Sequence, residues 1–235
     1  MTVASLLLAL LAPCALHVHA GTIGLGRLSS PPLLEGAVRT CARDLALNRF
    51  TVLHNFINEE DLSDVRADLD GRYARGEMLQ AGVRGRVGGN DGGSPSAVIS
   101  TIRNAVTVWL DNSQPQTAVE SNLLLFLDVL RMQLAEELRL DLSLEDTEVL
   151  YARYPVGGFY ATHSDSHSPG SPWGLQARST ERMLSFVLYV NEQPWARADG
   201  GQLRMHGREV DSWARSVDVP PTVGSLVLFL SQDFR

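Results

Sequence analysis

Short apolar segments separated by turn-forming residues dominate the C-terminal part of this 235-residue chain, and they constrain its fold more than any other feature. After residue 147, runs rich in Val, Leu, Phe and Tyr alternate with stretches that contain Gly, Pro, Asn and Asp. Several short strands at such intervals are typical of an antiparallel sandwich or barrel. We predict strands at residues 148–154, 158–163, 183–190, 201–205 and 225–230.

Two helices are predicted upstream of these strands. Apolar residues recur at helical spacing within 117–139, which indicates an amphipathic helix that either covers one face of a sheet or binds a partner. Asn58 is a suitable N-cap for a second helix that runs to about Arg75. Three acidic residues follow Asn58 in the first turn, where the helix dipole favours anions.

His163 and Asp165 are the residues most informative about function. In an extended strand, side chains two residues apart project from the same face, so this spacing aims an imidazole and a carboxylate at one point. Both groups are ligands of divalent metals, and two histidines with one carboxylate form the triad of non-haem Fe(II) oxygenases. A His-x-Asp pair also arises by chance, so the sequence around it must decide whether it is a metal site. A second histidine ligand is not obvious in the chain.

Composition excludes some classes of protein. With 44% hydrophobic and 20% charged residues, the chain can fill a core. The formal charge of −7 and the pI near 5.3 argue against nucleic acid as a partner, because phosphate binding needs clustered cations.

The N-terminus has the features of a targeting segment. Residues 3–16 are apolar but short for a bilayer span, and Val18-His19-Ala20 resembles a cleavage site. We predict a secretory signal peptide at residues 1–20, a location in the endoplasmic reticulum lumen or outside the cell, and no membrane span after cleavage. The alternative is an organelle-targeting segment or an uncleaved membrane anchor, because Met1-Thr2 carries no side-chain cation.

The remainder divides into three parts by composition. Residues 21–40 are expected to be a linker, 41–147 a helical N-terminal support region, and 148–235 the strand-rich domain. Cleavage after Ala20 would leave Cys41 as the remaining cysteine, which excludes an internal disulfide.

Four blocks of the strand-rich region, in this order, resemble the iron- and 2-oxoglutarate-dependent dioxygenases, and within them the prolyl 4-hydroxylase-like group. The resemblance implies an α+β fold with a double-stranded β-helix (jelly-roll) core and N-terminal helices packed outside it. Residues 102–110 resemble the segment that precedes the barrel in that group, more loosely. The four blocks are residues 151–165, 182–191, 199–203 and 219–229.

By this resemblance, His163 and Asp165 are iron ligands. Tyr154 and Tyr189 stand where the group places side chains against 2-oxoglutarate. The same resemblance places Val187 and Leu203 in the lining of that pocket, and His167 and Trp173 in a loop over the site that contacts substrate. For His167, a solvated loop histidine is the alternative.

The implied reaction is hydroxylation of a substrate carbon, in which Fe(II), O2 and 2-oxoglutarate take part and succinate and CO2 are released. L-Ascorbate is the expected reductant of the iron. The group suggests peptidyl proline as substrate, so a protein or peptide partner is expected.

The chain departs from the pattern of the group after Leu230. The group places there a distal iron-binding histidine, a basic partner for the far carboxylate of 2-oxoglutarate, and a closing strand, none of which is visible here. The fold is therefore expected to be C-terminally incomplete, with an exposed apolar edge at residues 226–230, and the chain as given to be inactive. Three alternatives remain open: an incomplete dioxygenase, a natural pseudoenzyme, and a non-enzymatic jelly-roll binding module such as a lectin.

Overall fold

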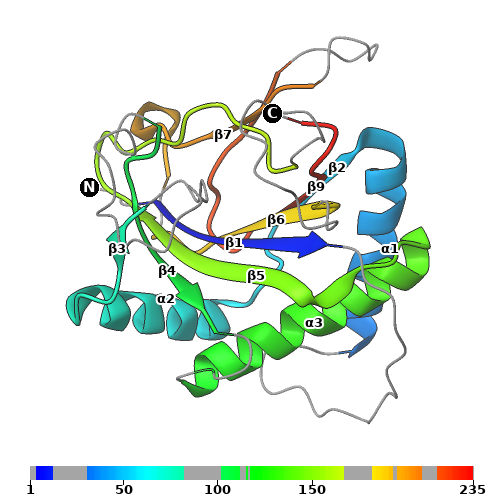
Figure 1. Ribbon diagram of the computed structural model, residues 1–235, viewed down its shortest axis with the longest axis horizontal. Coiled ribbons are helices and arrows are strands. Elements are labelled where there is room, and N and C mark those ends of the chain that lie inside the picture. The colour runs from blue at the N-terminus through cyan, green and yellow to red at the C-terminus, as the bar shows by residue number, and fades with distance from the viewer. Residues whose placement is uncertain are drawn as a thin grey trace, which may run out of the picture.

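In the computed structural model, the described part of the chain forms a large antiparallel sheet, a small antiparallel sheet and three helices (Figure 1). The structure describes residues 4–12, 31–81, 102–111, 115, 117–166, 182–192, 195–207 and 216–234. The helices are α1 (Pro31–Asn48), α2 (Glu59–Ala74) and α3 (Ala118–Leu138), with a short 3-10 helix at Arg197–Asp199. The strands are β1 (Ala4–Ala12), β2 (Phe50–Leu53), β3 (Leu79–Gln80), β4 (Val106–Leu110), β5 (Ser143–Tyr154), β6 (Leu184–Tyr189), β7 (Leu203–Met205), β8 (Val217–Val219) and β9 (Leu226–Leu230).

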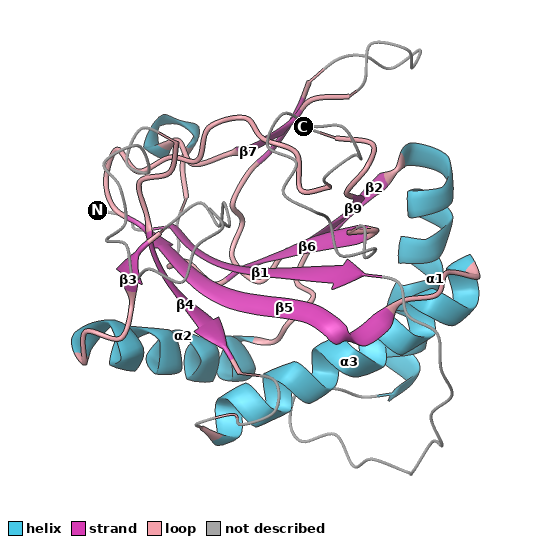
Figure 2. Ribbon diagram, in the orientation of Figure 1, coloured by secondary structure: helices cyan, strands magenta, loops and turns pink. Residues whose placement is uncertain are grey.

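The two sheets and the helices are arranged in layers. In the large sheet the strands lie in the order β2-β9-β6-β1-β5-β4-β3, and β7 pairs with β8 in the small sheet. The helices lie along one side of the large sheet and β7 lies on the other (Figure 2). This separation of helices from antiparallel strands is the α+β class predicted from the sequence.

Strand β6 contributes to two hydrophobic clusters because successive side chains of a strand point to opposite faces. One cluster lies between the large sheet and the helices, and the other lies between the large sheet and the small one. All six residues of β6 are buried, and Ser185 is the polar exception in this apolar run. The helix side takes Leu184, Phe186 and Leu188, and the opposite side takes Val187 and Tyr189.

The structure confirms both predicted helices. They could be predicted because a few consecutive residues determine where each begins. The Asn58 side chain caps α2 by accepting a hydrogen bond from the backbone N of Asp61 at 2.9 Å, and the C-cap is Arg75. In α3, the Thr117 hydroxyl accepts from the backbone N of Glu120 at 3.1 Å. Helix α3 covers the large sheet with buried residues that recur at helical spacing.

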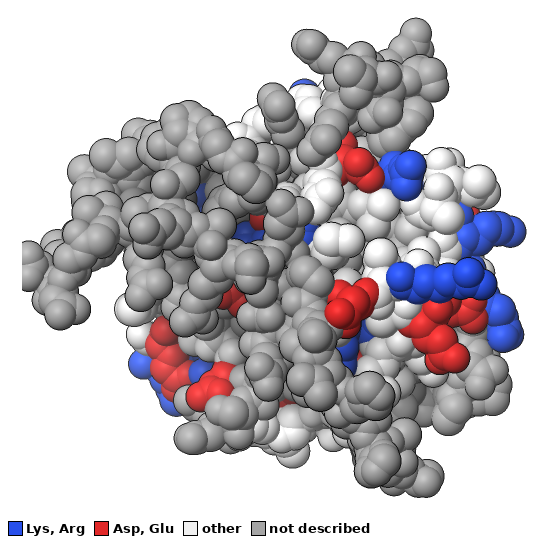
Figure 3. All heavy atoms as spheres, turned by 45° about the vertical axis from the view of Figure 1, so that its right-hand side comes forward, with Lys and Arg blue, Asp and Glu red and all other residues white. Residues whose placement is uncertain are grey.

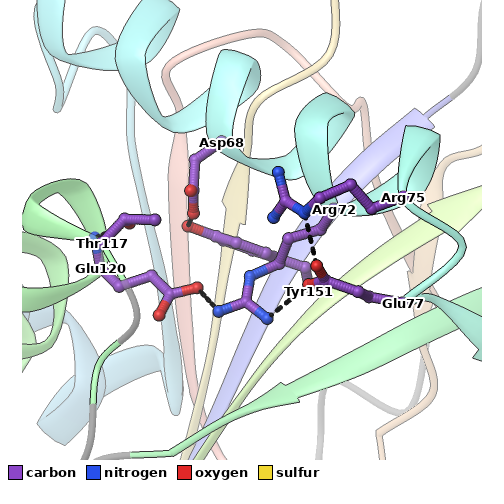
Figure 4. Close-up of polar contacts among 7 residues, drawn as sticks. All are labelled: Asp68, Arg72, Arg75, Glu77, Thr117, Glu120 and Tyr151. Atoms are coloured by element: carbon purple, nitrogen blue, oxygen red, sulfur yellow. Dashed lines mark hydrogen bonds and ion pairs between the residues drawn. The ribbon is translucent and has the colours of Figure 1, made fainter.

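A buried ion pair joins α2 and α3 (Figure 4). The Arg72 guanidinium on α2 binds the Glu120 carboxylate at the start of α3, and the two side chains are 4% and 0% exposed. Arg72 also donates from Nη1 to Glu77 Oε2 at 3.0 Å. On the neighbouring strand β5, the Tyr151 hydroxyl donates to Asp68 Oδ2 at 3.0 Å. These polar contacts fix α2 and α3 relative to each other and α2 against the sheet.

The structure differs from the sequence-based expectation in the N-terminal half. Helix α1 begins at Pro31, inside the stretch 21–40 that was expected to be a linker, and proline is well tolerated in the first turn of a helix. The region 41–147, expected to be helical, also contributes β2, β3 and β4 to the large sheet.

The expected strand at 158–163 is wrong. Gly158 N donates to Pro155 O at 2.7 Å and closes a turn in which Gly157 has a φ of 76°, a conformation that glycine adopts readily. The chain then forms one isolated bridge, between Tyr160 and Arg103. Strand β8, which has only three residues, was missed.

The exposed apolar edge expected at Leu226–Leu230 is also wrong. Strand β9 pairs with β2 on one side and with β6 on the other. Both neighbours are antiparallel and in register along the strand, so the backbone groups of β9 are shared with two partners. Strand β2 (Phe50–Leu53) therefore covers the edge that was expected to be exposed.

Strand β1 occupies the position between β5 and β6 in the large sheet. Ala4 is opposite Tyr154 of β5, and Leu6 is opposite Tyr189 of β6. The signal peptide at residues 1–20 stays a prediction, but a chain cleaved after Ala20 would lack this strand.

Charges of both signs are mixed on the surface. Figure 3 shows arginine and acidic side chains next to one another on the face drawn. Two ion pairs with exposed arginines are Arg43 with Asp44 and Arg204 with Asp218. None of the helices in the described part of the chain has the length and hydrophobicity that a bilayer span needs.

Candidate metal centre

A cavity of about 880 Å³ lies between the large sheet and the small one. Its wall brings together side chains from β5, β6, β7 and the irregular segment that follows β5. His167 and Trp173, which were expected in a loop over the site, lie outside the described residues. The other predicted site residues all line this cavity: His163, Asp165, Tyr154, Tyr189, Val187 and Leu203.

Two backbone hydrogen bonds hold the segment that carries His163 in place. Asn104 N donates to Phe159 O at 2.8 Å, and Ala161 N donates to Ile102 O at 2.7 Å. The short stretch before β4 therefore acts as a clamp on residues 159–161. His163 follows this clamp directly, so its position depends on a contact between distant parts of the sequence.

The His163 imidazole is fixed on three sides. Its Nδ1 lies 2.8 Å from Ala161 O, and its Nε2 lies 3.2 Å from Asp165 Oδ1. The Tyr160 ring stacks on it, with 3.6 Å between ring centroids and an angle of 19° between the planes. The convergence of His163 and Asp165 is thus as predicted, although the segment bends and is not the strand from which the prediction was made.

The Asp165 side chain is 9% exposed, and Ser185 on β6 supports its carboxylate. Ser185 Oγ donates to Asp165 Oδ2 at 2.7 Å and lies 2.8 Å from Ser231 Oγ. Burial alone would raise the pKa of Asp165, but the hydrogen bonds from His163 and Ser185 and the charge of Arg182 together hold this pKa below its usual value. The carboxylate is therefore ionised at neutral pH.

The tyrosines Tyr154 and Tyr189 present buried hydroxyl groups to the same cavity. Burial raises the pKa of both phenols, and the Arg103 guanidinium opposes part of the rise at Tyr154. Both hydroxyls are therefore protonated at neutral pH and can donate hydrogen bonds to an acceptor in the cavity.

The other described histidines do not complete a metal site. His206 lines the cavity, but its Nδ1 lies 2.9 Å from Ser216 Oγ. The Nδ1 of His54 lies 3.1 Å from Ser225 Oγ, and His54 is not part of the cavity wall. Among the described residues, no group of three His, Cys, Asp or Glu side chains could hold one ion.

The geometry of His163 and Asp165 fits two ligands of one metal ion. Because Nδ1 is engaged with Ala161 O, Nε2 is the ring nitrogen that faces the carboxylate oxygen. A divalent cation bound by both atoms would take the place of the proton between them. The two atoms are 3.2 Å apart, so His163 and Asp165 would hold one ion together.

Sequence reasoning missed three residues that shape the site. Ser185 had a signal, because it is a lone polar residue inside the apolar run of β6. Tyr160 and Arg103 had none, because the bridge that pairs them joins segments far apart in the chain.

Comparisons with known proteins identify the family of the chain. The family model of the 2OG-Fe(II) oxygenase superfamily matches residues 149–235. The chain is similar to the crystal structure of a Pseudomonas putida prolyl-4-hydroxylase, with 31% sequence identity, a TM-score of 0.66, and coverage of 84% of this chain and 88% of that chain. No curated protein was found to match.

A second similar structure is a prolyl hydroxylase from Trichoplax adhaerens in complex with a hypoxia inducible factor oxygen degradation domain peptide fragment. The TM-score is 0.65 and the identity 18%, with 86% of this chain and 81% of that chain covered, so this likeness supports the jelly-roll fold. From the family match and the Pseudomonas relative together, the chain belongs to the 2OG-Fe(II) oxygenase superfamily and is prolyl 4-hydroxylase-like within it.

Proposed function

We propose that this chain is an Fe(II)- and 2-oxoglutarate-dependent dioxygenase that hydroxylates peptidyl proline. The observation that carries the proposal is the pair formed by His163 Nε2 and Asp165 Oδ1, which face each other at 3.2 Å in the wall of a large cavity. Iron held by these two side chains supplies the oxidative chemistry of the superfamily, in which O2 and 2-oxoglutarate are consumed, succinate and CO2 are released, and a substrate carbon is hydroxylated.

The protein contributes ligand orientation. Ala161 O fixes the tautomer of His163 by accepting from Nδ1, and Ser185 holds one carboxylate oxygen of Asp165, so that the other oxygen faces the imidazole. L-Ascorbate, in this proposal, returns oxidised iron to the ferrous state.

The cosubstrate binds, in this proposal, to the tyrosine hydroxyls. Tyr154 and Tyr189 donate hydrogen bonds to carboxylate oxygens of 2-oxoglutarate, which their raised pKa values permit at neutral pH. Val187 and Leu203 form an apolar part of the same wall and exclude water from the reacting groups.

A peptide substrate is supported by the rim of the cavity and by both similar structures. Val156 and Phe159 line the cavity and are 69% and 44% exposed, so they offer apolar surface beside the metal ligands. The Pseudomonas relative is a prolyl-4-hydroxylase, and the Trichoplax protein was solved with a peptide bound.

One observation favours a second function, peptide binding without catalysis. The described residues contain no third metal-ligating side chain beside His163 and Asp165. If this chain holds iron weakly, the cavity and its rim remain as a surface that binds a peptide.

Succinate formation distinguishes the two functions. The chain is incubated with 2-oxoglutarate, ascorbate and a proline-containing peptide, with and without Fe(II), and succinate and the peptide mass are measured. Iron-dependent succinate and a peptide heavier by one oxygen would support the dioxygenase and contradict the expected inactivity of the chain as given, and Asp165→Ala should then abolish both. The matched control is His54→Ala, which removes an imidazole outside the cavity. Peptide binding with no succinate under any condition would instead establish the second function.

A further inference from the structure

Arg103 is a buried cation that has no acidic partner among the described residues. The residue is 6% exposed, and its Nε and Nη2 atoms are buried with no hydrogen-bond partner. None of the ion pairs in the described part of the chain includes it, whereas Arg72 and Arg131, which are also buried, bind Glu120 and Asp128. A buried charge without a counter-ion is costly, so some other contact must retain Arg103.

Two tyrosines provide that contact: Tyr154 through a side-chain hydrogen bond and its ring, and Tyr160 through its ring. The guanidinium carbon of Arg103 lies 4.6 Å from the centre of the Tyr160 ring and 5.7 Å from that of Tyr154. Both distances are within the range of a cation–π interaction, which strengthens when the cation is removed from water. The backbone explains the pairing with Tyr160, because the two residues are opposite each other in an isolated antiparallel bridge, where side chains of one face are neighbours.

The same tyrosine ring also lies against the metal-binding imidazole. The centroids of Tyr160 and His163 are 3.6 Å apart and the rings are nearly parallel. A ring at that distance covers one face of Tyr160, so the guanidinium must occupy the other face. Arg103, Tyr160 and His163 therefore form a continuous stack that begins behind the cavity wall and ends at a metal ligand.

We propose that Tyr160 is a positioning residue that sets the plane of the His163 imidazole, and that Arg103 holds Tyr160 in that position. The imidazole can rotate about its χ2 angle, and its contacts with Ala161 O and Asp165 Oδ1 hold only its edges. The Tyr160 ring blocks the remaining rotation by contact with the face. This inference rests on His163 being a metal ligand, as in the proposed function.

Metal affinity of the apoprotein tests the stack without any need for turnover. Binding of Mn(II) and Co(II) is measured by calorimetry, and the absorption spectrum of the Co(II) form reports ligand geometry. Tyr160→Leu removes the stacked ring and is expected to weaken metal binding about 10- to 100-fold, the range seen when a partner that orients a ligand is lost. Tyr160→Phe keeps the ring and should bind nearly as the wild type does.

Arg103 is tested with a pair of variants. Arg103→Gln should weaken metal binding and alter the Co(II) spectrum, and Arg103→Lys should recover most of the affinity because it retains a cation above the ring. The matched control is Tyr73→Leu, which breaks a cation–π contact of the same kind, 4.3 Å from the Arg153 guanidinium carbon, on helix α2. Thermal unfolding of each variant identifies losses of metal affinity that are due to misfolding. If Tyr160→Leu or Arg103→Gln does not fold, the metal affinities of Tyr160→Phe and Arg103→Lys are compared with that of the wild type.

The outcomes separate the inference from the proposed function. Equal metal affinity and an unchanged Co(II) spectrum in Tyr160→Leu would overturn the inference alone. Equal losses in Tyr160→Leu and Tyr160→Phe would also overturn it, because the hydroxyl and not the stacked ring would then matter. A wild-type chain that binds neither metal overturns the assignment of His163 as a ligand, and the inference with it.

Discussion

Ser185 Oγ on β6 lies 2.7 Å from Asp165 Oδ2, which ties the one carboxylate of the candidate metal centre to the middle of the large sheet. Both residues are buried, and a second buried hydroxyl, that of Ser231, lies 2.8 Å from Ser185 Oγ. The carboxylate is thus oriented by a rigid strand although Asp165 itself lies in an irregular segment.

Ser185→Ala should weaken metal binding about 10- to 100-fold, because the free carboxylate oxygen can then rotate away from His163. Calorimetric titration with Mn(II) measures the change. Ser231→Ala is the matched control, since it removes a buried hydroxyl but leaves the bond between Ser185 and Asp165 in place. Equal affinities of the two variants would mean that Ser185 does not orient the ligand.

Gly158→Ala should destabilise the fold by about 1–3 kcal/mol, the usual range for forcing atoms into a packed site. A Cβ atom at this position would lie 2.8 Å from Asn104 O, Pro155 O and Pro155 Cδ, and two of these three are backbone atoms that cannot swing aside. The clamp on residues 159–161 would have to open, so metal binding should weaken as well. Urea unfolding measures the stability.

Gly71→Ala is the control for this change. It adds the same methyl group inside α2, where the nearest atom is the flexible end of Arg75 at 3.1 Å. There the gain in helix propensity, about 0.5–1 kcal/mol, should offset the contact. A Gly158→Ala protein as stable as Gly71→Ala would contradict the close approach between the two segments.

The features that could be predicted from the sequence are those with a local cause. The cap at Asn58, the helix over 117–139 and the spacing of His163 and Asp165 each depend on a few consecutive residues. The clamp from residues 102–104 and the stack of Arg103 on Tyr160 form where two distant segments of the chain come into contact. No short sequence pattern predicts that contact. The strand expected at 158–163 failed because Gly157 and Gly158 form a turn that outweighs the alternation of apolar residues.

Glu120→Gln should cost about 3–5 kcal/mol of stability, because it leaves the buried Arg72 guanidinium without its enclosed counter-charge. Glu77→Gln removes a carboxylate from the same guanidinium at a site that is 31% exposed, and its effect should be much smaller. Urea unfolding compares the two. If the double variant Arg72→Met, Glu120→Leu recovers most of the loss, the cost comes from the unpaired charge and not from lost packing.

Cys41 should be unreactive in the folded chain. Burial, with a smaller contribution from the Asp44 charge, raises the pKa of its thiol from 9.0 to about 12. Because the folded state keeps the proton more tightly, this group stabilises the fold fully below pH 9 and loses that contribution as the pH rises toward about 12. Alkylation should stay slow at pH 9 in buffer and become fast in urea, since the thiolate is the reactive form. Peptide mapping separates Cys41 from Cys14, and rapid labelling of the native protein would contradict the burial.

Strand β1 leads to a prediction about the N-terminus. In the large sheet β1 lies between β5 and β6 and pairs with both, so a chain that starts at Gly21 leaves two interior strands without a partner on one side. Each backbone group that is buried without a partner costs about 1–3 kcal/mol, and all residues of β6 are buried. The shortened chain should therefore have a lower melting temperature, a looser cavity and weaker Mn(II) affinity than the full chain.

The same comparison tests the proposed secretory route. The full chain is expressed in host cells that process secretory signal peptides, and mass spectrometry identifies the first residue of the recovered protein. Recovery of a folded chain that begins at Gly21, with the stability and metal affinity of the full chain, would support the signal peptide and make β1 dispensable. Recovery of the uncleaved chain, together with unfolding of the shortened one, would instead establish residues 4–12 as a retained part of the sheet, because a strand that pairs on both sides cannot be removed without opening the layer that carries Tyr154 and Tyr189.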